Sequence, residues 1–156
     1  MRYLGVFIEK KTKWDVDLPS DEEEIMRKSA EIYKRAYMLR SKFNKCSLEV
    51  KRYLFSTYLS SIYCSSLWNL NHSQDRKITV AYNNAFRIVC NFRKDCSATE
   101  MLSENCVRNL IEIRKVAIYS LLGRNLNSSN SLIEFIAYSS IHGESKLSNS
   151  WKTVCT

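Results

Sequence analysis

Glycine, proline and histidine are scarce in this chain of 156 residues, which contains 3 Gly, 1 Pro and 2 His. Such a composition excludes collagen-like chains and low-complexity disordered segments, which need many of the first two. Long apolar runs are also missing, and a membrane span would need about 18 to 20 such residues in a row. We therefore expect a compact helical protein with no membrane partner.

We expect no secretory leader. The first apolar run, "YLGVFI", is short and is followed by Lys10, Lys11 and Lys13 rather than by the small residues of a cleavage site. The protein is therefore expected to be intracellular, either nuclear or cytoplasmic. Its six cysteines are then expected to be reduced thiols, most of them packed as small hydrophobic side chains.

No catalytic centre can be recognised in the sequence. Two-metal phosphoryl transfer needs close carboxylates, whereas the five aspartates include no adjacent pair. Asp15 and Asp17 form D-x-D, which we interpret as two solvated residues of an edge strand. Glycine-rich phosphate loops are absent. A structural zinc held by Cys90, Cys96, Cys106 and one histidine stays an alternative, although the spacing lacks a tight C-x2-C pair. No metal or cofactor site is predicted.

The chain is rich in positive charge, with a net charge of +8 and a pI of about 9.2. Polyanions are therefore the expected partner class. A basic protein with no role in nucleic-acid binding is the alternative that composition leaves open.

Most of the chain has helical periodicity. Residues 3–8 predict a strand, with 12–18 as a partner, and Pro19 ends the extended segment. Ser20 and Glu23 form a capping box that begins a helix reaching about residue 45. Further helices are expected at 48–68, 74–91, in a short segment after Ser97, at 107–126 and at 131–139. The fold class is mainly α: an N-terminal β-hairpin or strand followed by a bundle of about five helices, with the helix at 48–68 the most buried.

The first long helix carries a row of positive side chains. Between residues 25 and 60 there are nine basic residues and two acidic ones, Glu31 and Glu49. A row with so few acids suits contacts with successive phosphates, although a plain solvated face is an equal alternative. The row, spaced by sevens, is Lys28, Arg35 and Lys42, and its flanking residues are Arg27, Lys34 and Lys45.

Three blocks in order resemble the end of a non-LTR (LINE-type) retrotransposon reverse transcriptase. They are "RYLGVFI", the stretch "LPSDEEEIMRKSAEIYKRAYMLRSKFNKCSLEVKRYLFSTYLSSIYCSSLW", and "AYNNAFRIVCNFRKDCSATEML", and together they span about residues 2–125. The resemblance implies a primer-grip-like hairpin at 1–19, thumb-like helices at 20–70, a helical region after the thumb at 71–141 and a tail at 142–156, within one compact unit. By analogy, Tyr3, Leu4 and Gly5 are the primer grip.

The resemblance also implies what this chain lacks. The family is an RNA-directed DNA polymerase whose palm holds magnesium through an aromatic-x-Asp-Asp box and an upstream aspartate, and neither occurs here. We expect a truncated copy without palm and fingers, inactive alone, whose thumb-like part binds the backbone of an RNA/DNA duplex. The alternative is a non-catalytic basic helical interaction protein, or a transposon remnant without a function.

Overall fold

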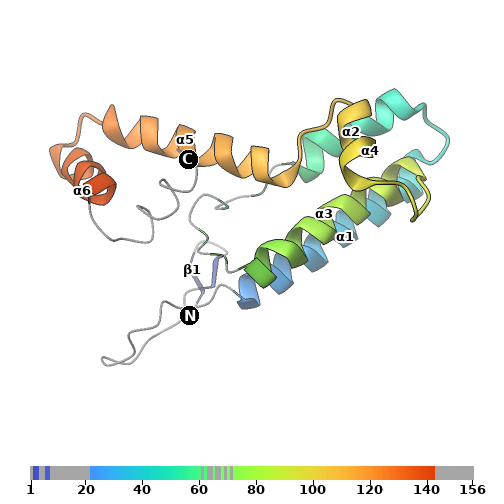
Figure 1. Cartoon of the computed structure of the whole chain (residues 1–156), viewed down its shortest axis with the longest axis horizontal. Coiled ribbons are helices and arrows are strands. Elements are labelled where there is room, and N and C mark those ends of the chain that lie inside the picture. Colours follow the sequence, from blue (N-terminus) through green and yellow to red (C-terminus); the bar gives the residue numbers. More distant parts are fainter. Residues whose placement is uncertain are drawn as a thin grey trace. The chain divides into compact units, whose positions relative to one another are not determined.

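A computed structural model describes Arg2–Tyr3, Val6–Phe7, residues 22–60, the single positions 62, 65, 68 and 70, and residues 72–142. Within these residues the protein is mainly helical, as predicted (Figure 1). The six helices are α1 (Glu22–Phe43), α2 (Leu48–Leu59), α3 (His72–Cys90), α4 (Ala98–Glu104), α5 (Leu110–Leu126) and α6 (Ser131–His142).

Two very short strands lie at the N-terminus, β1 (Arg2–Tyr3) and β2 (Val6–Phe7). They pair antiparallel, with Arg2 opposite Phe7 and Tyr3 opposite Val6. This ladder differs from the predicted one, in which residues 3–8 pair with residues 12–18. The predicted partner segment, together with Pro19 and Ser20, lies outside the described residues, so the larger hairpin stays a prediction.

The chain forms two compact units. The first contains Met1–Ile62 and Leu70–Leu110, and the second contains Tyr63–Asn69 and Ile111–Thr156. Helices α1 to α4 belong to the first unit, and α6 with nearly all of α5 belongs to the second. In the second unit, Ile118 of α5 and Ala137 of α6 are buried together, with Leu122 and Leu126 packed against them. The predicted functional parts, with boundaries at residues 19, 70 and 141, stay predictions.

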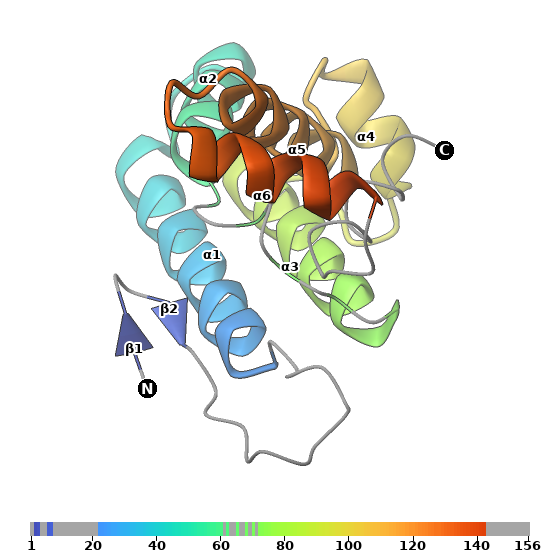
Figure 2. The same ribbon diagram turned by 90° about the vertical axis from the view of Figure 1, so that its left-hand side faces the viewer.

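Helices α1 and α3 lie side by side and run in the same direction (Figures 1 and 2). Their side-chain contacts advance together along both helices, which establishes the parallel alignment. The contacts, each 3.1 Å long, join Glu22 to Lys77, Tyr33 to Asn84 and, just past both helix ends, Asn44 to Asn91. Both C-termini therefore lie at one end of the pair.

The core of the first unit is centred on α3. This helix has more buried residues than α1, α2 or α4. Tyr82 and Phe86 of α3 both pack edge-on against Phe55 of α2, with ring centroids 5.1 and 4.8 Å apart. All three rings are inaccessible to solvent. Edge-to-face packing of this kind adds about 0.5–1.5 kcal/mol per pair to the burial of the rings.

The prediction of a long, central helix at 48–68 was wrong. Helix α2 ends at Leu59 with Ser60 as its C-cap, and its buried residues are only Lys51, Phe55 and Leu59. The serines that follow explain the early end, because serine hydroxyls compete for backbone hydrogen bonds and weaken a helix interior. Helix α2 therefore covers the core from one side, and α3 takes the central place.

Candidate nucleic-acid interface

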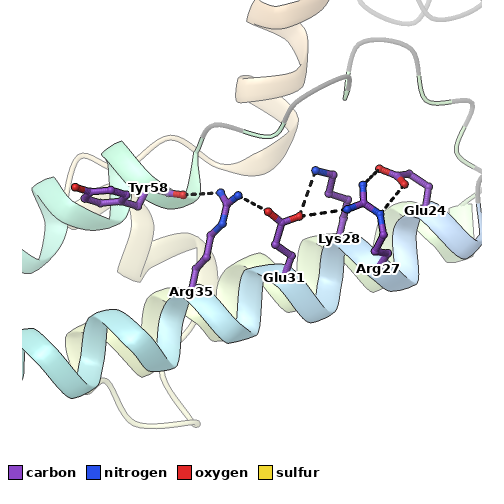
Figure 3. A network of polar contacts seen from close by, with 6 residues as sticks. All are labelled: Glu24, Arg27, Lys28, Glu31, Arg35 and Tyr58. Atoms are coloured by element: carbon purple, nitrogen blue, oxygen red, sulfur yellow. Dashed lines mark hydrogen bonds and ion pairs between the residues drawn. The ribbon is translucent and has the colours of Figure 1, made fainter. Parts of the chain in front are cut away.

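The predicted basic row is partly neutralised by Glu31 of α1 (Figure 3). The carboxylate of Glu31 forms ion pairs with Lys28 at 3.3 Å and with Arg27 at 3.7 Å. It also forms an ion pair with Arg35, which donates a hydrogen bond to it. The three cations lie three or four residues from Glu31, so their side chains meet it on one helix face. Lys28 and Arg35 thus serve the fold of the first unit in this structure, and their predicted contacts with phosphate stay a prediction.

A second acid holds Arg27. Glu24 is only 2% exposed, and its two carboxylate oxygens accept hydrogen bonds from Arg27 Nη2 at 2.6 Å and Nε at 3.0 Å. Two parallel hydrogen bonds between a guanidinium group and a carboxylate form the most specific ion-pair geometry. The sequence suggested only a capping box at the start of this helix. The structure adds that Glu24 fixes Arg27 to the helix surface.

Arg35 also caps the C-terminal end of α2. Its Nη1 donates a hydrogen bond of 3.0 Å to the main-chain oxygen of Tyr58 in the last turn of that helix. The final carbonyl groups of a helix have no partners within it and carry partial negative charge, so a guanidinium group stabilises them. Arg35 therefore links Glu31 on α1 to the C-terminus of α2.

These contacts change the proton affinities of the groups involved. Burial alone would raise the pKa of Glu31, but the charges of Lys28 and Arg35, a hydrogen bond from Lys28 and the charge of Arg27 lower it overall. The pKa of Arg27 is raised, chiefly by its hydrogen bonds to Glu24. Both shifts favour the charged forms, so the network persists at neutral pH.

The other three predicted residues have a different environment. Lys34, Lys42 and Lys45 are exposed, and no ion pair holds any of them within the part of the chain that the structure describes. Lys42 lies in the last turn of α1 and Lys45 in the loop that follows it. The exposed members of the predicted set therefore lie mostly toward the C-terminal end of α1.

The parallel alignment of α1 and α3 brings further cations to this end. The hydrogen bond between Asn44 and Asn91 joins the loop after α1 to the loop after α3. Residues 40–52 and 87–96 together contain eight Lys and Arg but only two Asp and Glu. We call the exposed cations of these two helix ends the basic end; they are Arg40, Lys42, Lys45, Arg93 and Lys94.

Part of this charge has a structural role. Arg87 donates hydrogen bonds to the side chain of Asn84 at 3.0 Å and to the main-chain oxygen of Cys96 at 2.8 Å, which positions the loop carrying Arg93 and Lys94. Arg93 forms an exposed ion pair of 3.0 Å with Asp95, a kind of contact that contributes little. Two parallel helix C-termini also favour nearby cations. The fold does not need the other cations of the basic end for these contacts.

The opposite end of the helix pair carries little net charge. Glu22, Glu23 and Glu24 occupy the first turn of α1, and Asp75 occupies the first turn of α3. Ion pairs with Lys77 and Arg27 offset the charges of Glu22 and Glu24. A polyanion is therefore expected to prefer the basic end.

An open groove of about 460 Å³ follows the exposed side of α2. Tyr53, Val50 and Leu54 provide apolar surface, Arg52 provides a cation, and Cys106, just after α4, closes one side. Sequence reasoning did not predict this groove, because it interpreted the rings of this segment as core residues and gave a base-stacking platform only as the alternative. The signal for exposure was available in the helical spacing: Tyr53 lies on the side of α2 opposite the buried Lys51 and Phe55.

Several predicted sites cannot be located or are not assembled. Leu4 and Gly5 of the predicted primer grip lie outside the described residues, as do Asp15 and Asp17, and only the backbone of Tyr3 is described. Within the described ranges, no three His, Cys, Asp or Glu side chains come together as metal ligands, the proposed zinc set of Cys90, Cys96 and Cys106 included. None of the helices described is both long and apolar enough to cross a bilayer.

Burial also keeps one thiol protonated. Desolvation raises the pKa of Cys90, the last residue of α3, to about 11, although the nearby charge of Lys51 opposes the shift. The described cysteines, 46, 90, 96 and 106, are all free thiols.

The chain was compared with protein-family models, with curated proteins and with solved structures. None of these three comparisons gives a match.

Proposed function

We propose that this chain is a non-catalytic, thumb-like piece of a non-LTR (LINE-type) reverse transcriptase that binds the sugar–phosphate backbone of an RNA/DNA duplex. The observation that carries the proposal is the basic end, where cations from two helices gather with few acids. Each cation that neutralises a phosphate releases counterions, so such a cluster binds nucleic acid without reading its sequence. Of the six residues predicted from the sequence, Lys42 and Lys45 are the principal contacts, with Lys34 beside them on α1.

The N-terminal segment has a part in the same proposal. By analogy with the family, residues 1–19 form a hairpin that packs against a palm, with Tyr3, Leu4 and Gly5 at the primer end. The palm and fingers of a parent polymerase, with their magnesium ions, would then be the protein partner. The carboxylates that bind this magnesium are absent from the sequence, so primer extension by the purified chain should be blank. Incorporation above background would contradict that expectation.

Salt dependence of binding tests the basic end directly. The affinity for an RNA/DNA duplex is measured by fluorescence anisotropy over a range of salt concentrations, for the wild type and for a Lys42→Ala, Lys45→Ala, Lys94→Ala variant. If all three contact phosphate, the slope of log K against log [salt] should become shallower by about 2 to 3. Lys28 and Arg35 are left in place because their removal would also break the ion pairs with Glu31.

A control with the same loss of charge separates location from net charge. Arg76, Lys77 and Arg108 are exposed residues of the first unit that lie outside the basic end. Their replacement by alanine should leave the slope within about 0.5 of the wild type. Equal effects of the two triple variants, or no measurable binding by the wild type, would refute the proposed interface.

The second unit favours a second candidate function, that of an interaction protein. Its two helices expose large apolar side chains, which are Ile111, Val116, Tyr119, Leu132, Ile133, Phe135 and Tyr138. Contiguous exposed apolar surface marks sites of association. Sedimentation equilibrium in the absence of nucleic acid tests this candidate, because association that disappears in a Leu132→Glu, Phe135→Glu variant would support it.

A further inference from the structure

The groove on α2 has the composition of a base-stacking site. Tyr53 is 71% exposed, more than any other large apolar side chain among the described residues of the first unit. Val50 and Leu54 line the groove with it and add apolar surface. A volume of about 460 Å³ lies in the range of small-molecule sites and can hold a nucleotide. Aromatic rings beside cations are the usual means by which proteins hold unpaired bases.

Charge and position connect the groove to the basic end. Arg52 and Glu49 both line the groove, but within the described residues Arg52 forms no ion pair with Glu49 or with any other acid, so its guanidinium group can meet a phosphate. A guanidinium group can stack on a base or bind a phosphate. Helix α2 begins at Leu48, three positions after Lys45 of the basic end. A strand whose phosphates lie on the basic end can therefore reach the groove with its next bases.

We infer that the groove on α2 binds an unpaired nucleotide, with its base stacked on Tyr53 and its phosphate near Arg52, in a nucleic acid held by the basic end. The inference rests on the proposed function and makes it more specific, because a duplex has no free base to offer. The preferred ligand is then a single strand, or a duplex with an unpaired extension, rather than a blunt duplex. Apolar contact alone would suit a peptide or a second copy of this chain, but the unpaired Arg52 and the neighbouring cations favour a polyanion.

The test compares two tyrosines of the same helix. Tyr53 lines the groove, whereas Tyr58 is also half exposed, at 51%, but lies outside it. Binding of an oligodeoxythymidine of about 12 nucleotides and of a blunt RNA/DNA duplex is measured by fluorescence anisotropy. Tyr53→Ala should weaken single-strand binding by about fivefold to a hundredfold and leave duplex binding unchanged. Tyr53→Phe, which keeps the ring, should bind as the wild type does.

The slope of the salt dependence separates this inference from the proposed function. Tyr53→Ala removes no phosphate contact, so its slope should equal that of the wild type, whereas the Lys42, Lys45, Lys94 variant should have a shallower slope for both ligands. If the lysine variant behaves as expected but Tyr53→Ala binds the single strand no worse than Tyr58→Ala does, the groove is not a base site and the basic end stands.

Two other outcomes would overturn the inference. If the wild type binds neither nucleic acid, it falls together with the proposed function. If the chain self-associates without nucleic acid and Tyr53→Ala abolishes the association, the groove seats a second copy instead. Circular dichroism and the melting temperature of Tyr53→Ala should match those of the wild type, because the replaced ring is mostly in solvent.

Discussion

The guanidinium group of Arg35 lies 3.0 Å from the main-chain oxygen of Tyr58 and thereby joins the middle of α1 to the end of α2 (Figure 3). The same group donates a hydrogen bond to Glu31. A residue that belongs to the predicted phosphate-binding row thus has two partners inside the protein. Its removal should affect stability whether or not nucleic acid is bound, which separates its structural contribution from any binding role.

Replacement of Arg35 is expected to destabilise the fold. Arg35→Ala should lower the free energy of unfolding by about 1 kcal/mol, because the Tyr58 carbonyl and the Glu31 carboxylate each lose a donor but stay partly hydrated. Arg35→Lys should recover less than half of this loss, since a single ammonium group cannot span both acceptors. Urea titration measures the effect. The neighbouring Lys34→Ala serves as the control and should stay within about 0.5 kcal/mol of the wild type.

The stability of the fold should depend on pH through Glu31. Its pKa is lower in the folded protein than the ordinary value of 4.5, so the unfolded chain binds the proton more readily. The stabilisation is therefore complete above the ordinary pKa and is lost as the pH falls through the lower, folded value. The difference in unfolding free energy between the wild type and Glu31→Gln should shrink from about pH 6 to about pH 3.

An exposed acid provides the control for this titration. Glu104→Gln, in α4, should differ from the wild type by a small amount that changes little over the same pH range, because no ion pair is recorded for Glu104 among the described residues. A constant difference between the wild type and Glu31→Gln would mean that the ion pairs of Glu31 with Lys28 and Arg35 do not stabilise the folded state.

The helices themselves were largely predictable. The periodicity of α1 predicted a buried face of six residues, of which four are buried and two, Ser29 and Phe43, are half-buried; the four are Ile25, Ile32, Ala36 and Leu39. For α3 it predicted five residues, of which Ile88 is half-buried and the others are buried: Ile78, Tyr82, Ala85 and Val89. A repeat of three and four residues is a local property of the sequence, and it decides which face of a helix meets the core. The same reasoning placed all six ends of α3, α5 and α6 within three residues of those observed.

The candidate site was less predictable, because it depends on which helix ends meet. Nothing in the periodicity of α1 or α3 states that they run parallel, so Arg93 and Lys94 could not be joined to Lys42 and Lys45. The neutralisation of Lys28 and Arg35 was within reach, since Glu31 lies three residues from one and four from the other. The count of acids was right, but one well-placed carboxylate engages three cations.

Helix ends are the other feature that the sequence concealed. Asn91 and Cys106 follow the ends of α3 and α4 and both have a positive φ, 60° and 53° respectively. Asparagine tolerates this left-handed conformation, and the side chain of Asn91 gains a hydrogen bond to Asn44. Cysteine has no such advantage. Cys106 adopts this conformation because the hydrogen bonds that end α4 require it, and not because cysteine favours it.

Tyr82 is expected to hold three segments together through its hydroxyl group. The hydroxyl donates to the main-chain oxygen of Arg108 at 3.1 Å and lies 3.3 Å from the Ser60 hydroxyl. Tyr82→Phe should therefore lower the free energy of unfolding by about 1–2 kcal/mol, because the ring still packs but two partly buried hydrogen bonds are lost. Ser60→Ala leaves the bond to Arg108 intact and should cost less than half as much. Equal costs in a urea titration would assign the main contribution to Ser60 instead.

Cys106 offers a stabilising substitution. After α4, the amide of Val107 donates to the oxygen of Leu102 at 2.9 Å, and the amide of Cys106 donates to the oxygen of Ser103 at 3.0 Å. This pair of bonds is the Schellman motif, whose left-handed residue is usually glycine because a Cβ atom crowds the backbone there. Cys106→Gly should therefore raise the free energy of unfolding by about 0.5–1 kcal/mol.

Other substitutions at the same position distinguish relief of strain from loss of the thiol. Cys106→Ala removes the thiol but keeps the Cβ atom, so it should leave stability within about 0.5 kcal/mol of the wild type. Cys106→Val should destabilise, because a β-branched side chain is the least tolerated in the left-handed region. Thermal unfolding of the three variants gives the order directly. If the Cys106→Gly and Cys106→Ala variants proved equally stable, the turn after α4 would carry no backbone strain. The position of Cys106 in the groove beside Tyr53 would then depend on side-chain packing alone.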